Sequence, residues 1–219
     1  MIGRHRVSLR WQGPLTFREI FMSSGRLLIL VVVTFLAALL PIAAVRAEGD
    51  GRFALHWPEH VYVWYYNPAN TPAWLTPEEG LALMKEATAS WAPCGVTLRF
   101  GGLTDKMPGH MDGTNVVGWK TDGRAHSAWT SWRAHRDGRA IEADITLYAN
   151  IFEDYRRRGI DVRLELRKSI IHEFGHVLGL GHSEQFGDAM LVKVRTRPEW
   201  KLPSENDLAV CRRLYPDPE

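Results

Sequence analysis

Five residues in one short segment have the types and spacing of a catalytic metal site: His172, Glu173, His176, Gly179 and His182. Histidines four residues apart lie on one face of a helix, where two imidazoles can bind a single Zn²⁺ at roughly 2.0–2.1 Å. Glycine can leave a helix at positive φ without a Cβ penalty, so Gly179 would turn the chain back and bring in His182 as the third ligand. Three protein ligands leave one coordination position for water, as in a catalytic zinc site.

Glu173 is not expected to bind the metal, because the glutamate of an H-E-x-x-H segment acts as the general base of zinc peptidases. We therefore predict hydrolysis of peptide bonds by a zinc-activated water, with Glu173 taking a proton and returning it to the leaving amine. The alternative is a zinc-stabilised binding or adhesion module without turnover. The intact Glu173 argues against that alternative, since a structural zinc site does not need this acid.

A methionine follows the motif at a characteristic distance. Asp188, Ala189 and Met190 come after the third histidine where an extended zinc motif places its Met-turn. A lone methionine usually fills a core. Here its position predicts that Met190 supports the metal site from beneath without binding the metal.

With this extended motif and Met-turn, the sequence resembles the metzincins and, within them, the matrixins of the bacterial type, which are matrix-metalloprotease-like zinc peptidases. Ser183, directly after the third histidine, is similar to the matrixin form, and the resemblance covers roughly residues 55–216. It implies a secreted zinc metalloendopeptidase with one catalytic Zn²⁺. The implied fold is α+β, with a twisted, mostly parallel sheet, an antiparallel edge strand, a long first helix, an active-site helix and a C-terminal helix.

The sequence departs from this family at several positions. We expect no cysteine-switch propeptide, because no cysteine precedes the catalytic region in the sequence. Val192 and Val194 stand where matrixins often have Pro and Tyr, and Asn206 stands where many have the first of two acids. His110 and Asp112 come before the strand that they follow in family members with a second, structural zinc. Calcium in the Asp- and Gly-rich loops stays an open alternative.

The elements that position these residues follow from turn residues, periodicity and the resemblance. Thr76, Pro77 and Glu79 have the spacing of a capping box with proline at the first helical position, and predict the start of the first helix. The active-site helix is expected over residues 163–179. Residues 125–130 are predicted as an edge strand that pairs with extended substrate. Further strands are expected at 60–66, 95–100, 115–119 and 141–147, and the C-terminal helix at 204–215.

The sequence contains two cysteines, Cys94 and Cys211, which suits an exported protein with a single disulfide. Residues 93–96 superficially resemble a latency motif, in which a cysteine thiolate caps the catalytic zinc. Cys94 follows the first helix, however, whereas a latency cysteine belongs upstream of the catalytic domain. We therefore predict a disulfide in preference to free buried thiols.

The first 47 residues have the pattern of a secretory signal peptide. Arg26 precedes an almost wholly apolar run over residues 27–45, and Val45 and Ala47 occupy the −3 and −1 positions of a cleavage site. Met22 is an alternative start that would give a compact signal by itself. Without cleavage, the apolar run approaches the ~20 residues that span a bilayer, and the protein would be a membrane-anchored form of the same protease.

Cleavage after Ala47 would leave residues 48–219, a length of 172 residues that fits a single catalytic domain with a sizeable core. It would remove six arginines and one glutamate, so that the formal net charge changes from +2 to −3. This composition has no basic footprint for nucleic acid. We expect a secreted or periplasmic monomer that binds protein or peptide substrates and has no stable membrane association.

The signal-peptide hypothesis predicts cleavage between Ala47 and Glu48, which N-terminal sequencing of the exported protein checks. The expected first residue is Glu48. A membrane-bound protein that retains residues 27–45 would support the anchored form instead.

Overall fold

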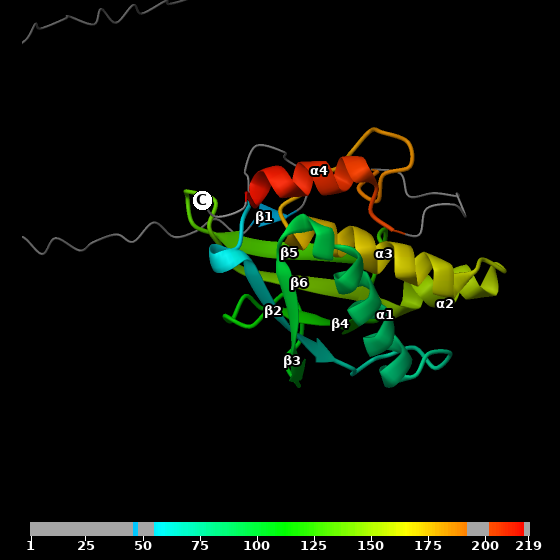
Figure 1. Cartoon of the computed structure of the whole chain (residues 1–219). Coiled ribbons are helices and arrows are strands. Elements are labelled where there is room, and N and C mark those ends of the chain that lie inside the picture. The colour runs from blue at the N-terminus through cyan, green and yellow to red at the C-terminus, as the bar shows by residue number, and fades with distance from the viewer. Residues whose placement is uncertain (1–45, 48–54, 192–201, 217–219) are drawn as a thin grey trace, which may run out of the picture. The chain divides into compact units, whose positions relative to one another are not determined.

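The computed structural model describes residues 46–47, 55–191 and 202–216 (Figure 1). All of these residues belong to one compact unit. The predicted signal peptide therefore lies outside the described residues, apart from the backbone of residues 46–47. Within the described part of the chain, no helix has the length and apolar character needed to cross a membrane.

A mixed sheet forms the centre of the fold, with its strands in the order β1-β5-β6-β4-β2-β3. β2 is parallel to β3 and β4, and β4 is parallel to β6, whereas β5 runs antiparallel to β6. The short β1 pairs antiparallel with β5 and so occupies the edge beside it. The mostly parallel sheet agrees with the prediction, whereas the antiparallel β5, which we predicted as the edge strand, has β1 beyond it. The strands are β1 (Arg46–Ala47), β2 (Val61–Asn67), β3 (Thr97–Leu103), β4 (Val116–Lys120), β5 (Ala128–Ala134) and β6 (Ala140–Tyr148).

Helices α1 and α3 pack against each other, and both contact the sheet, so they cover the same face (Figure 1). The α-helices are α1 (Pro77–Ser90), α2 (Ala149–Arg157), α3 (Val162–Val177) and α4 (Glu205–Leu214), and two short 3-10 helices are η1 (Pro58–His60) and η2 (Ala92–Cys94). The sequence did not predict α2. It follows β6 directly, and Tyr148 at its N-cap makes no side-chain capping hydrogen bond, so the usual start signal is missing.

α1 begins at the predicted capping box. Glu79 N–H donates to Thr76 Oγ1 at 3.2 Å, and Thr76 N–H donates to Glu79 Oε2 at 2.9 Å. Ser204 and Asp207 make the same reciprocal pair at the start of α4, and Asp161 caps α3 by accepting from Leu164 N–H. These side chains satisfy backbone donors that have no partner inside the helix.

Two strands differ from their predicted limits by three residues or more. β3 continues to Leu103, because it pairs with β2 along its whole length across a bulge, whereas we predicted a strand that ends at residue 100. β5 spans Ala128–Ala134 rather than residues 125–130. Its register comes from a hairpin with β6, in which His135 N–H donates to Arg139 O, and no single-strand pattern reveals such a pairing.

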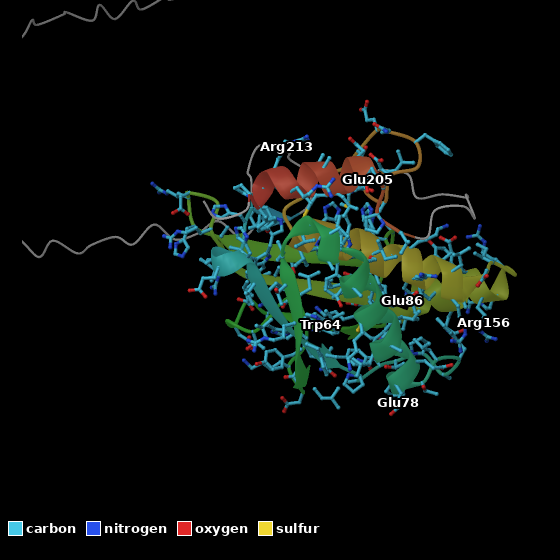
Figure 2. All side chains as sticks on the ribbon, in the orientation of Figure 1. Trp64, Glu78, Glu86, Arg156, Glu205 and Arg213 are labelled. Atoms are coloured by element: carbon cyan, nitrogen blue, oxygen red, sulfur yellow. A yellow bond between two sulfur atoms is a disulfide. The ribbon has the colours of Figure 1, made fainter. Side chains whose placement is uncertain are left out.

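Aromatic side chains fill the interior between the sheet and the helices. Tyr62, Trp64 and Tyr66 alternate along β2 and are fully buried, and the Trp64 ring lies 5.7 Å from the Phe174 ring of α3. Trp91 donates its indole N–H to the Ile171 carbonyl of α3 at 3.0 Å. The helices, in contrast, carry charged side chains at exposed positions. Figure 2 labels five of them: Glu78, Glu86, Arg156, Glu205 and Arg213.

Cys94 and Cys211 form a disulfide that joins η2 to α4. Both residues are fully buried, and their Cα atoms are 5.4 Å apart, within the usual range for a disulfide. The bond spans 117 residues, so it connects the C-terminal helix to the end of α1 across most of the domain.

Replacing both cysteines by serine is expected to lower the free energy of unfolding, because the disulfide restricts the unfolded chain. The chain-entropy model gives about 4–5 kcal/mol for a loop of this length, as an upper value. Chemical denaturation of the Cys94→Ser/Cys211→Ser variant measures the loss. Intact-mass analysis with alkylation is the control, and two alkylated thiols in the unreduced, unfolded wild-type protein would contradict the pairing.

Candidate metal centre

The histidine motif lies at the end of α3, where the helix closes with a Schellman turn. Gly179 N–H donates to His176 O at 2.9 Å and Leu180 N–H donates to Gly175 O at 3.0 Å, which satisfies two of the last helical carbonyls. Gly179 adopts a φ of 90°, in the left-handed region that favours glycine. The chain therefore leaves the helix at the residue that the sequence indicated.

Gly179 is also required by a close approach of two backbone segments. A Cβ at this position would lie 2.1 Å from the carbonyl oxygen of Leu55. Any larger residue would push away the segment that precedes η1. The turn and this contact together direct the chain from α3 towards His182.

The structure brings the three predicted ligands together. One ligand nitrogen from each of His172, His176 and His182 lies within 4.8 Å of the others, and the ring centroids are 4.7 to 5.2 Å apart. The two helix histidines are buried, whereas His182 is exposed on the loop. One side of the cluster therefore faces solvent.

Hydrogen bonds behind the rings indicate which nitrogens can bind a metal. His172 Nδ1 lies 2.7 Å from Ala189 O, and His176 Nδ1 lies 2.8 Å from Leu180 O. A carbonyl can only accept, so each Nδ1 carries the proton and each neutral ring presents an Nε2 lone pair. The two Nε2 atoms are 3.1 Å apart, close enough for both to bind one cation. The donor set therefore fits Zn²⁺ held by neutral imidazoles.

Glu173 lies beside the cluster and contacts a strand of the sheet. Its side chain is almost fully buried. Thr130, buried on β5, donates its hydroxyl to Glu173 Oε2 at 2.6 Å. This hydrogen bond orients the carboxylate, and β5 therefore passes directly next to the proposed general base.

Met190 is buried below α3, where a glycine makes room for it. A Cβ on Gly175 would lie 2.2 Å from the Met190 sulfur and 3.0 Å from the Trp91 ring. Gly175 stands between the two helix ligands, so the methionine packs against the backbone that positions both. This packing is compatible with the predicted supporting role of Met190.

Two side chains from distant parts of the chain bond the last carbonyls of α3. Trp57 donates its indole N–H to Val177 O at 2.7 Å, and Tyr215 donates its hydroxyl to Leu178 O at 3.0 Å. Carbonyls at a helix end need donors from outside the helix. Residues before β2 and after α4 thereby fix the helix end that precedes Gly179.

The charge of Glu173 also affects the phenol hydroxyl of Tyr148. Burial raises the pKa of Tyr148, at the end of β6, and the charges of Asp122 and Glu173 raise it further. The Tyr148 phenol therefore stays neutral at physiological pH.

The acids near the loop of residues 104–115 hold backbone rather than forming a second metal site. Asp144 on β6 accepts from Gly109 N–H and Val116 N–H, at 2.5 and 2.7 Å. Burial raises the pKa of Asp144 to about 6, and these two hydrogen bonds oppose the rise. The neighbouring Glu142 accepts from Gly113 N–H at 2.9 Å, and Arg133 lies 3.2 Å from its carboxylate.

Among the described residues, the three-histidine cluster is the set of metal-binding side chains that the structure assembles. No ligand set there supports calcium or a structural zinc. Val192 and Val194, which stand at the family's specificity positions, lie outside the described residues.

Sequence reasoning missed Thr130 and Gly175. A glycine inside a helix is unfavourable, so Gly175 carried a weak signal of close contact. Thr130 carried no such signal, because its contact with Glu173 depends on how β5 packs against α3.

Of the comparisons with known proteins, the one with family models agrees with the motif. The family model described as Matrixin matches residues 110–216. No curated protein matches the chain. Among solved structures, the chain is similar to one titled "GM1 bound form of the ECX AB5 holotoxin", with a TM-score of 0.43 and 18% sequence identity, over 71% of this chain and 80% of that chain.

Replacing Thr130 by valine keeps the shape of the side chain but removes the hydroxyl that orients Glu173. We expect kcat for peptide cleavage to fall about 10-fold with KM nearly unchanged, since a hydrogen bond to a charged group contributes about 1.5–3 kcal/mol. Steady-state kinetics on one peptide measure both constants, and the Thr130→Ser variant is the control that keeps the hydroxyl. An unchanged kcat in Thr130→Val would contradict the assigned contact.

Proposed function

The chain is a matrixin-like metzincin over residues 110–216, and we propose that it is an exported zinc metalloendopeptidase. The observation that carries this proposal is the meeting of three imidazoles with the Glu173 carboxylate beside β5. Histidine-only ligation by three residues is typical of a zinc that keeps a position for water. A structural zinc would instead use four protein ligands.

The catalytic roles follow from the chemistry of the side chains. Zinc, when bound by His172, His176 and His182, supplies the Lewis acidity that activates water and polarises the scissile carbonyl. Glu173 accepts the proton of the attacking water and returns it to the leaving amine. Thr130 holds this carboxylate in place through its hydrogen bond to Oε2.

β5 supplies the proposed binding edge for the substrate. Its backbone runs past Thr130, and the next residues, Ser131 and Trp132, pair antiparallel with β1. An extended peptide can add to such an edge in the same way and place a carbonyl next to the metal centre. Cleavage after Ala47 would remove β1 and leave this edge for a protein or peptide substrate.

We place the mature protein outside the cytoplasm, as a single catalytic domain over residues 48–219. The buried Cys94–Cys211 disulfide supports an oxidising compartment. The apolar segment before residue 46 supports export.

The Glu173→Ala variant tests the proposed chemistry. It removes the general base and none of the three ligands, so zinc content should stay complete while the turnover of peptides falls about 10²–10⁴-fold. His182→Ala should instead lose zinc, because two histidines on one helix make an incomplete site. Zinc content and cleavage of a mixed peptide library, with and without a chelator, are the measurements.

The matched control is Glu184→Ala, which removes an exposed acid two residues after His182 and should behave as the wild type. Full turnover in a zinc-loaded Glu173→Ala protein would contradict the role of Glu173. A zinc-loaded wild type that cleaves no peptide would favour the binding module instead.

A further inference from the structure

Two buried aspartates, Asp188 and Asp207, lie behind the metal centre. Their exposed fractions are 1% and 2%. A buried carboxylate is costly unless hydrogen bonds replace its water. The donors that each one uses therefore reveal what it holds in place.

Asp188 connects the loop of the third ligand to the start of α4. Its Oδ2 accepts from Ser183 Oγ at 2.5 Å and from Asn206 Nδ2 at 2.6 Å. Its Oδ1 accepts from Ser204 Oγ at 2.6 Å. All three donors are neutral side chains, and one of them belongs to the residue directly after His182.

Asp207 holds the backbone at Ala189 and Met190. It accepts from Ala189 N–H at 2.7 Å and Met190 N–H at 3.3 Å. Ala189 O in turn bonds the His172 ring. Asp207 therefore acts through the backbone behind a helix ligand, whereas Asp188 acts next to the loop ligand.

His182 needs such support more than its partners do. His172 and His176 are fixed by α3, but His182 is exposed on a loop. Three hydrogen bonds hold the neighbouring Ser183: its N–H donates to Met190 O at 2.7 Å, its hydroxyl donates to Asp188, and the same hydroxyl accepts from Gln185 N–H at 2.9 Å. Without the second contact, the loop could rotate and carry the third imidazole away from the other two.

We propose that Asp188 is a positioning residue for the metal centre, which holds His182 in place through Ser183 and is itself held by Asn206 and Ser204. The identity of the metal rests on the proposed function. Asn206 is essential to this arrangement because its amide donates to the carboxylate, whereas an aspartate there would place two negative charges face to face.

Exchanging the two side chains provides the test. In Asp188→Asn the carboxylate is lost, and in Asn206→Asp a second one opposes it. The double variant restores one carboxylate and one amide, so the two changes should couple. Ser183→Ala is the mildest variant, since it removes a single hydroxyl from a half-buried residue.

The measurement is the rate at which zinc-loaded full-length protein releases zinc to a chromogenic chelator, with no peptide present. Each single exchange should speed release about 10-fold or more, the usual effect of losing a group that orients a ligand. Ser183→Ala should speed release several-fold, and the double variant should release zinc more slowly than either single exchange. The matched control, Glu205→Gln, alters an exposed side chain in the same turn of α4 (Figure 2) and should match the wild type.

Thermal unfolding of the same variants separates positioning from stability. Lower unfolding temperatures with unchanged zinc release, in Ser183→Ala and in every exchange variant that folds, would overturn the proposal. A double variant that is at least as impaired as the sum of the single variants would also overturn it. Because no peptide is needed, a failure of the proposed protease function would appear in the cleavage assay and leave this result unaffected.

Discussion

The turn at Gly179, packed against the Leu55 carbonyl, is the contact on which the metal centre depends. A helix that continued through this residue would carry the third imidazole around its axis and away from His172 and His176. The absence of a side chain allows both the positive φ and the close approach of the Leu55 carbonyl, whose oxygen would lie 2.1 Å from a Cβ at this position. The same turn satisfies the helix carbonyls, so the geometry that the metal needs is also a stable helix end.

Around this turn, the three histidines are held by groups that lie outside the proposed ligand set. Backbone carbonyls of Ala189 and Leu180 set the ring tautomers. The buried Asp207 holds the backbone at Ala189, and the buried Asp188 holds the loop after His182 through Ser183. Such outer partners strongly influence metal affinity. The imidazoles bond backbone carbonyls through Nδ1, and a carboxylate in turn bonds the backbone at Ala189. This arrangement of partial and full negative charge favours a cation between the rings.

The sequence predicted the features whose cause is local. The ligand spacing, the glycine after the helix and the capping box at Thr76 each depend on a few neighbouring residues, and the two cysteines left a single pairing. The sequence did not predict the roles of Thr130 and Gly175, or the helix α2, because their causes are not local. Thr130 reaches Glu173 only through the register of the β5–β6 hairpin, and Gly175 is needed only because Met190 returns beneath it.

α4 follows the histidine motif in the chain, yet it completes the structure around that motif. It or its flanks supply Asp207 behind the Met-turn, Cys211 for the disulfide and Tyr215 for the end of α3. In an exported chain that emerges N-terminus first, all three histidines appear before these supports do. A chain cut short before α4 would therefore carry the three histidines without the contacts that shape their surroundings.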